Sequence, residues 1–178
     1  AMNLINNGLF KNCLIVTSET YTKYISKDNR TCLPIFSDAA SSIFLNKESL
    51  PKMLSSFFLT DGRGAQNLCL TTKDDKQNLF MHGANVFTFT TENVPNATNR
   101  LLERANLKIE NIKLFIYHQA SSVVLDTIRD KLKIPKEKFY HDIESFGNTV
   151  SSTIPIALIK ADKEKRIPKK EPILIMGF

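Results

Sequence analysis

The stretch 112–121, IKLFIYHQAS, decides how the fold of this chain is interpreted. Its largely apolar first half predicts a buried strand over 112–117, with His118 directly after it. A second polar turn, FGNTVSS at 146–152, follows the next strand-like run and leads into a helical pattern. The segment between the two, 122–132, has the periodicity of a helix. This order of strand, helix and strand predicts a parallel unit within an α/β fold.

Two polar side chains follow the strands of this unit. The carboxyl ends of parallel strands open onto one crevice where ligands bind, so we expect His118 and Asn148 at the same edge. Taken singly, a histidine at a strand end is more often structural, and an asparagine after Gly147 is more often a turn or cap residue. Together they are two groups able to donate hydrogen bonds to an oxygen that becomes negative.

The rest of the chain predicts a layered arrangement of helices and strands. Strands are expected at 12–18, 42–45, 56–60, 67–71, 112–117, 138–144 and 172–176. Helices are expected at 94–105, with Pro95 in its first turn, and at 122–132 and 149–163, while 86–90 is a strand or the lead into a helix. A loose boundary near 83–85 divides the chain into 1–84 and 85–178.

Composition narrows the class of protein. The chain has 178 residues, 42% of them apolar, and no apolar run of membrane-spanning length. Three widely spaced cysteines (Cys13, Cys32, Cys69) and the lack of a signal-peptide pattern predict a cytoplasmic protein without disulfides, and no ligand spacing predicts a metal. The net charge of +6 lies largely in 160–170, a solvated segment. Only that charge favours the interpretation as a nucleic-acid-binding domain. No G-x-G-x-x-G motif supports a nucleotide-binding fold.

Six ordered blocks carry a resemblance to a known family. They are CLIVTSE at 13–19, DNRTC at 28–32, FSDAA at 36–40, LFMHG at 79–83, YHQA at 117–120 and GNT at 147–149. In this order and spacing the chain resembles the later part of the 3-oxoacyl-acyl-carrier-protein synthase III family, condensing enzymes of the thiolase superfamily. The resemblance implies a thiolase-like layered α/β/α fold with a mixed, mostly parallel sheet, truncated at both ends.

The resemblance also implies an activity. A cysteine takes an acyl group from acyl-CoA, and malonyl-acyl-carrier protein then loses CO2 to form an enolate that attacks it. By similarity, His118 and Asn148 are catalytic and donate hydrogen bonds to the enolate oxygen. Residues implied in binding coenzyme A and its pantetheine arm are Arg30, Gly83, Phe87, Ala120 and Ser121. The family implies acyl-CoA as a substrate rather than a cofactor, malonyl-carrier protein as a partner, and a homodimer.

The nucleophile is not among the cysteines present. In the family it begins a buried helix, and residues 1–7 resemble the tail of that helix, closed by Gly8. We therefore expect the cysteine before Ala1, the family's glycine loop to continue past 177–178, and this chain alone to be inactive. Ser121 and Val123 depart from the commonest motif and favour a specialised pathway. The alternative is a non-catalytic, carrier-binding subunit of the same fold, which an absent upstream cysteine would indicate.

Overall fold

A short parallel sheet forms the centre of the larger core. The computed structural model describes residues 1–48, 51–73 and 75–178. Three strands, β5 (Leu114–Tyr117), β6 (Phe139–Tyr140) and β7 (Ile173–Met176), pair in parallel in the order β6-β5-β7. All four residues of β5 are buried, as expected for a central strand covered on both faces.

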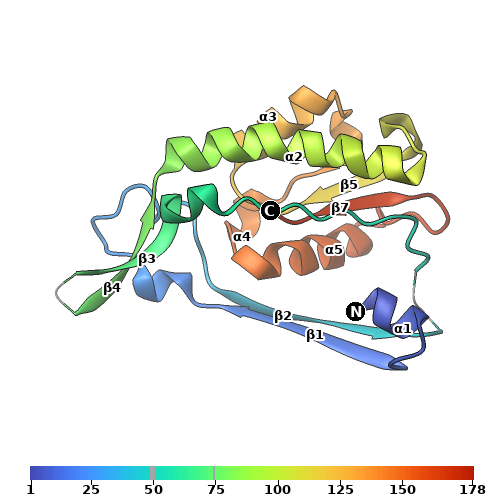
Figure 1. Cartoon of the computed structure of the whole chain (residues 1–178), viewed down its shortest axis with the longest axis horizontal. Helices are drawn as coiled ribbons and strands as arrows, with labels where there is room; N and C mark the ends of the chain where they lie inside the picture. Colours follow the sequence, from blue (N-terminus) through green and yellow to red (C-terminus); the bar gives the residue numbers. More distant parts are fainter. Residues whose placement is uncertain (49–50, 74) are drawn as a thin grey trace.

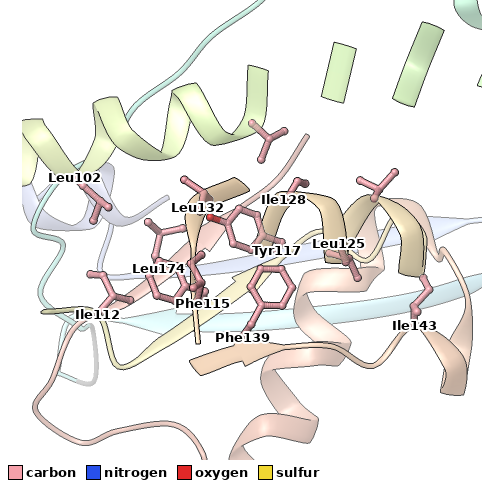
Figure 2. Close-up of a cluster of buried hydrophobic side chains, with 13 residues drawn as sticks. Leu102, Ile112, Phe115, Tyr117, Leu125, Ile128, Leu132, Phe139, Ile143 and Leu174 are labelled. Carbon is pink, nitrogen blue, oxygen red and sulfur yellow. The ribbon is translucent and has the colours of Figure 1, made fainter. Parts of the chain in front are cut away.

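Helices cover the two faces of this sheet. Phe115 and Tyr117 point into a cluster shared with α2 (Gly83–Ala105) and α3 (Ser122–Leu132), whose packing is shown in Figure 2. Leu114 and Ile116 alternate with them and pack on the other face against α5 (Thr153–Lys163). Figure 1 shows this order of layers, with α2 and α3 on one side of β5 and β7 and with α5 on the other. The α/β layered class predicted from the sequence is confirmed.

The antiparallel strands lie apart from the parallel sheet. One ribbon pairs β1 (Asn12–Glu19) with β2 (Ala39–Asn46) along their whole length. It runs on the far side of α5 from the parallel sheet (Figure 1), and both α5 and the turn before it contact the ribbon. A second hairpin pairs β3 (Leu68–Lys73) with β4 (Lys76–Met81) and leads directly into α2.

Short helical segments complete the described chain. They are α1 (Met2–Asn6), η1 (Tyr21–Tyr24), η2 (Gly62–Asn67), η3 (Ile109–Asn111), η4 (Lys136–Lys138), α4 (Ile143–Phe146) and η5 (Val150–Ser152). Gly8, predicted to close the first helix, has a φ of +76°, the conformation that favours glycine after a helix end. Within the described ranges, no helix is both long and apolar enough to cross a membrane.

Two predicted strands differ in the structure. Residues 56–60 form no strand, and Phe58 is 87% exposed. Apolar and aromatic residues favour strands only where another strand pairs with them, and this segment has no partner strand among the described residues. The strand expected over 138–144 is limited to β6, because α4 begins at Ile143. The strands expected at 12–18, 42–45, 67–71, 112–117 and 172–176 are present within a few residues.

The helix expected over 94–105 begins much earlier. The alternative in which 86–90 leads into it is the correct one, because α2 starts at Gly83. Pro95 therefore lies in the middle of the helix rather than in its first turn. A proline has no N–H, so the carbonyl of Thr91, four residues before it, loses its usual helical partner. The Lys131 ammonium of α3 donates to that carbonyl oxygen at 2.9 Å, which explains how the helix continues.

Candidate active site

The main chain of His118 is fixed at the end of the central strand. Its N–H donates to the carbonyl oxygen of Met176 in β7 at 2.8 Å, and its own carbonyl accepts from Ala120 at 3.0 Å. The ring of Phe178 contacts the imidazole edge-on, with 5.2 Å between the ring centroids. The imidazole is therefore held at the carboxyl edge of the parallel sheet, where the sequence placed it.

Partial burial keeps this imidazole neutral. Burial lowers the pKa of His118 to about 4, and a backbone hydrogen bond with Val150 opposes that shift only in part. The Nδ1 atom lies 2.6 Å from the hydroxyl oxygen of Thr153, the first residue of α5. At neutral pH, the ring is an uncharged group with one N–H to donate.

Asn148 is buried, and its main chain is hydrogen-bonded to a segment far earlier in the sequence. Its N–H donates to the carbonyl of Ile35, and its carbonyl accepts from the N–H of Ser37, each at 2.9 Å. In its side chain, Oδ1 accepts the N–H of Val150 at 2.9 Å. This bond assigns the oxygen end of the amide, so Nδ2 is directed elsewhere and has no hydrogen-bond partner within the described part of the chain. The amide is thus oriented as a donor.

Gly147 allows the turn that carries Asn148 to lie close to the segment 35–37. Its φ of +69° and ψ of −165° lie in a region that is essentially restricted to glycine. A Cβ atom there would come within 3.2 Å of both the Ile35 carbonyl oxygen and the Ser37 hydroxyl. That hydroxyl donates to the carbonyl of Phe146 and closes the turn. Glycine is therefore required both by the backbone conformation and by the space available.

Hydroxyl groups attach the following turn to the β1–β2 ribbon. The Thr17 hydroxyl lies 2.8 Å from that of Ser152 and 2.6 Å from that of Ser41. One residue earlier, the Ser151 hydroxyl donates to a carboxylate oxygen of Glu19 at 2.6 Å. The segment that follows Asn148 is thus bound to β1 at two successive residues.

Asn148 and His118 both interact with the backbone of Val150. Asn148 accepts the N–H of Val150, and the carbonyl of the same Val150 accepts the N–H of Thr153 and lies 3.0 Å from its hydroxyl, which contacts His118. Val150 itself has a φ of +53°, an unusual conformation for a β-branched residue. Such strained backbone clusters at functional sites, where surrounding contacts maintain it.

The other predicted site residues fall into two neighbourhoods. Ala120 and Ser121 lie two and three residues after His118, and the Ser121 hydroxyl caps α3 by accepting the N–H of Val124 at 3.3 Å. Gly83 lies next to the segment 30–31, since a Cβ on it would be 3.7 Å from the Thr31 methyl group. The Arg30 side chain is exposed at that place, and Phe87 is 36% exposed one turn further along α2.

None of the three cysteines has the setting of a nucleophile. Cys32 is fully buried, and burial raises the pKa of its thiol, which disfavours the reactive thiolate. Cys13 lies in β1 and Cys69 in β3, as the sequence predicted. Across the described ranges no cluster of histidine, cysteine and acidic side chains could hold a metal ion.

Sequence reasoning missed Thr153. It is 3% exposed and lies five residues after Asn148, at a position that reads simply as the start of a helix. Hydroxyl residues are common there as caps, so its type and position alone gave no reason to connect it with His118. The contact depends on how α5 approaches the end of β5, which only the folded structure shows.

Comparisons with known proteins agree with this geometry. The family model for 3-oxoacyl-[acyl-carrier-protein] synthase III matches residues 1–62, and the model for its C-terminal part matches residues 102–178. A beta-ketoacyl-[acyl-carrier-protein] synthase III of Listeria monocytogenes is 35% identical over the whole chain, which spans 56% of that protein's length.

Solved structures show the same relationship. A 3-oxoacyl-(acyl-carrier-protein) synthase III superimposes with a TM-score of 0.88 at 32% identity, covering 99% of this chain and 59% of that one. The synthase III of Thermus thermophilus gives a TM-score of 0.89 at 29% identity, covering 99% and 58%. The chain therefore has the thiolase fold. More specifically, it belongs to the 3-oxoacyl-[acyl-carrier-protein] synthase III family, and it spans about half the length of the relatives it matches.

Proposed function

We propose that this chain supplies the hydrogen-bond donors of a decarboxylating condensing enzyme. The reaction joins an acyl group from acyl-CoA to malonyl-acyl-carrier protein and gives 3-oxoacyl-carrier protein, CO2 and free CoA. The observation that carries the proposal is the pair formed by a half-buried, neutral His118 and an oriented Asn148 amide around Val150. Family membership agrees with it, since the relatives are named beta-ketoacyl-[acyl-carrier-protein] synthase III.

The reaction requires hydrogen-bond donors that do not protonate the carbanion. Decarboxylation breaks the bond between the malonyl α-carbon and its carboxylate, and the electron pair passes into a thioester enolate. That enolate then attacks an acyl thioester carbonyl, forming the new carbon–carbon bond and releasing a thiolate. Preorganised donors aimed at the enolate oxygen stabilise the transition state, each by a few kcal/mol.

The neutrality of His118 supports this role. An imidazolium would be an acid able to protonate the carbanion and end the reaction unproductively. With a pKa of about 4, the ring is uncharged at neutral pH and donates from a nitrogen that does not lose its proton. Asn148 adds an amide donor that does not titrate at all. The acyl-accepting cysteine is supplied from outside these 178 residues, because the three present lack an activating environment.

The remaining assignments belong to the same proposal. Arg30 contacts the adenine end of coenzyme A. The pantetheine arm is lined by Gly83, Phe87, Ala120 and Ser121. Acyl-CoA is a substrate, and no cofactor takes part. The carrier protein approaches near α3, where Val123 is 65% exposed. The working form is a cytoplasmic homodimer, with the active-site donors in the half formed by residues 85–178.

Separate measurement of the two half-reactions tests the proposal. In the full gene product, CO2 release from malonyl-carrier protein reports the donors, whereas transfer of radiolabelled acyl groups from acyl-CoA to protein reports the cysteine. We expect both reactions in the native protein, and we expect the 178-residue chain alone to show neither. A full gene product that binds carrier protein but catalyses neither half-reaction would instead be the non-catalytic subunit.

A further inference from the structure

We propose that Thr153 is a positioning residue that fixes the tautomer of His118. Its hydroxyl donates to Nδ1, which leaves the ring proton on Nε2. The structural part of this inference stands by itself, while its importance for catalysis rests on the proposed function. The contact that carries it is the 2.6 Å separation between Thr153 Oγ1 and His118 Nδ1.

The hydroxyl has one proton and two possible acceptors. In one arrangement it donates to the carbonyl of Val150, 3.0 Å away, and accepts from Nδ1–H. The imidazole Nε2 is then bare and can only accept. In the other arrangement the hydroxyl donates to Nδ1, and Nε2 carries the proton. Only the second arrangement makes His118 a donor through Nε2.

The distances favour the second arrangement. An O–H···O bond is about 2.5–3.0 Å long, so the 3.0 Å contact with the Val150 carbonyl is at the long limit for a hydroxyl donor. The contact of the hydroxyl with Nδ1, at 2.6 Å, is the shorter of the two. The proton of Thr153 is therefore best placed toward the ring.

The Val150 carbonyl does not need the hydroxyl proton. It already accepts the backbone N–H of Thr153 at the start of α5, so it stays hydrogen-bonded when the hydroxyl turns toward His118. The burial of Thr153, which is 3% exposed, keeps water from replacing the hydroxyl as the partner of Nδ1. With the ring proton on Nε2, Nδ1 accepts the Thr153 hydroxyl and the Val150 carbonyl still accepts the Thr153 N–H.

Removing the Thr153 hydroxyl should shift the ring proton of His118 from Nε2 to Nδ1. In Thr153→Val the shape is retained, but the polar atom left near the ring is the carbonyl of Val150, which can only accept. Nδ1 then has to hold the proton in order to donate to that carbonyl. Thr153→Ser keeps the hydroxyl and should keep the native tautomer.

Nitrogen NMR of the histidine rings tests this directly, because protonated and bare ring nitrogens resonate far apart. We would label the full gene product with ring-¹⁵N histidine and assign the His118 signals as those lost in His118→Gln. The Nε2–H form should dominate in the native protein and in Thr153→Ser. In Thr153→Val it should fall about tenfold or more and give way to the Nδ1–H form.

Thr149→Val is the matched control. Thr149 is 2% exposed and lies beside Asn148, but its hydroxyl has no hydrogen-bond partner in the described part of the chain. The same change of residue type should leave the His118 tautomer as it is. A native Nδ1–H form, or a Thr153→Val protein that folds and keeps Nε2–H, would overturn the inference.

A kinetic measurement separates this inference from the proposed function. If both hold, Thr153→Val lowers kcat for CO2 release about 100-fold with little change in KM, and Thr153→Ser restores it. If the tautomer changes as described but the native protein releases no CO2, the proposed function fails and the role of Thr153 stands. If the native protein is active and the tautomer is unaffected, the role of Thr153 fails and the function stands.

Discussion

Asn148 and Phe36 pair as an isolated parallel bridge, which joins the turn that carries the site amide to the segment before β2. The two backbone bonds of that bridge come from Ile35 and Ser37 on either side of Phe36. The candidate site is therefore built across the two parts of the sequence, and its geometry depends on how closely these two segments can approach.

Replacing Gly147 by alanine should disrupt that approach. The native backbone conformation at this position is reserved for glycine, and the added Cβ meets a backbone and a side-chain oxygen at 3.2 Å. We expect a loss of about 2 kcal/mol or more in the free energy of unfolding, measured by urea denaturation. Gly62→Ala is the matched control, because no atom lies within 4 Å of its added Cβ and its φ is not positive. A Gly147→Ala protein as stable as Gly62→Ala would show that the close contact is unimportant.

The depressed pKa of His118 predicts a pH dependence of stability. The folded state resists protonation until about pH 4, whereas an unfolded histidine protonates near its ordinary pKa of 6.5. Stability contributed by the neutral ring is thus complete above pH 6.5 and is lost as the pH falls toward 4. At about 1.4 kcal/mol per pKa unit, the loss is up to about 3.5 kcal/mol. Urea denaturation between pH 4 and 7 should show a shallower slope for His118→Gln, and equal slopes would contradict the assignment.

Lys131 should stabilise α2 by donating the hydrogen bond that Pro95 cannot supply to the Thr91 carbonyl. Replacing Lys131 by methionine keeps most of the apolar stem but removes the donor to the Thr91 carbonyl. We expect a loss of about 1 kcal/mol in the free energy of unfolding and faster amide hydrogen exchange near Thr91. Lys163→Met, at the exposed end of α5, is the control and should change neither quantity by a comparable amount.

The β-α-β unit was predictable because local pattern and burial agree there. The strand over 112–117 has apolar residues on both faces, and α3 was predicted over the residues that form it. The placement of His118 and Asn148 followed from that topology. In contrast, the alternation at 86–90 could not decide between a strand and the lead into a helix. The structure shows a helix there, with Phe87 and Phe89 exposed on α2.

The finer features of the site were not predictable from residue order. Thr153 contacts His118 only because α5 approaches the end of β5, and Thr17 contacts Ser152 only because the ribbon lies beneath that helix. Neither contact leaves a periodic or compositional signal. Single hydroxyl groups are common at helix starts and in strands, so their partners are set by tertiary packing.

Asn148→Asp isolates the donor function of the amide. The replacement keeps an oxygen to accept the N–H of Val150, so the turn should remain intact, but it removes Nδ2 and places a negative charge where the enolate develops. We expect CO2 release to fall at least 100-fold while acyl transfer from acyl-CoA stays within a few-fold of native. Loss of both half-reactions together would indicate a misfolded site instead.

The most direct test of the central claim is CO2 release from malonyl-carrier protein by the full gene product carrying His118→Ala, compared with the native protein and with Thr149→Val. The account predicts a fall of about 100-fold to 1,000-fold for His118→Ala, with acyl transfer retained and Thr149→Val close to native in both reactions. Undiminished CO2 release by a correctly folded His118→Ala protein would contradict the claim that His118 stabilises the enolate.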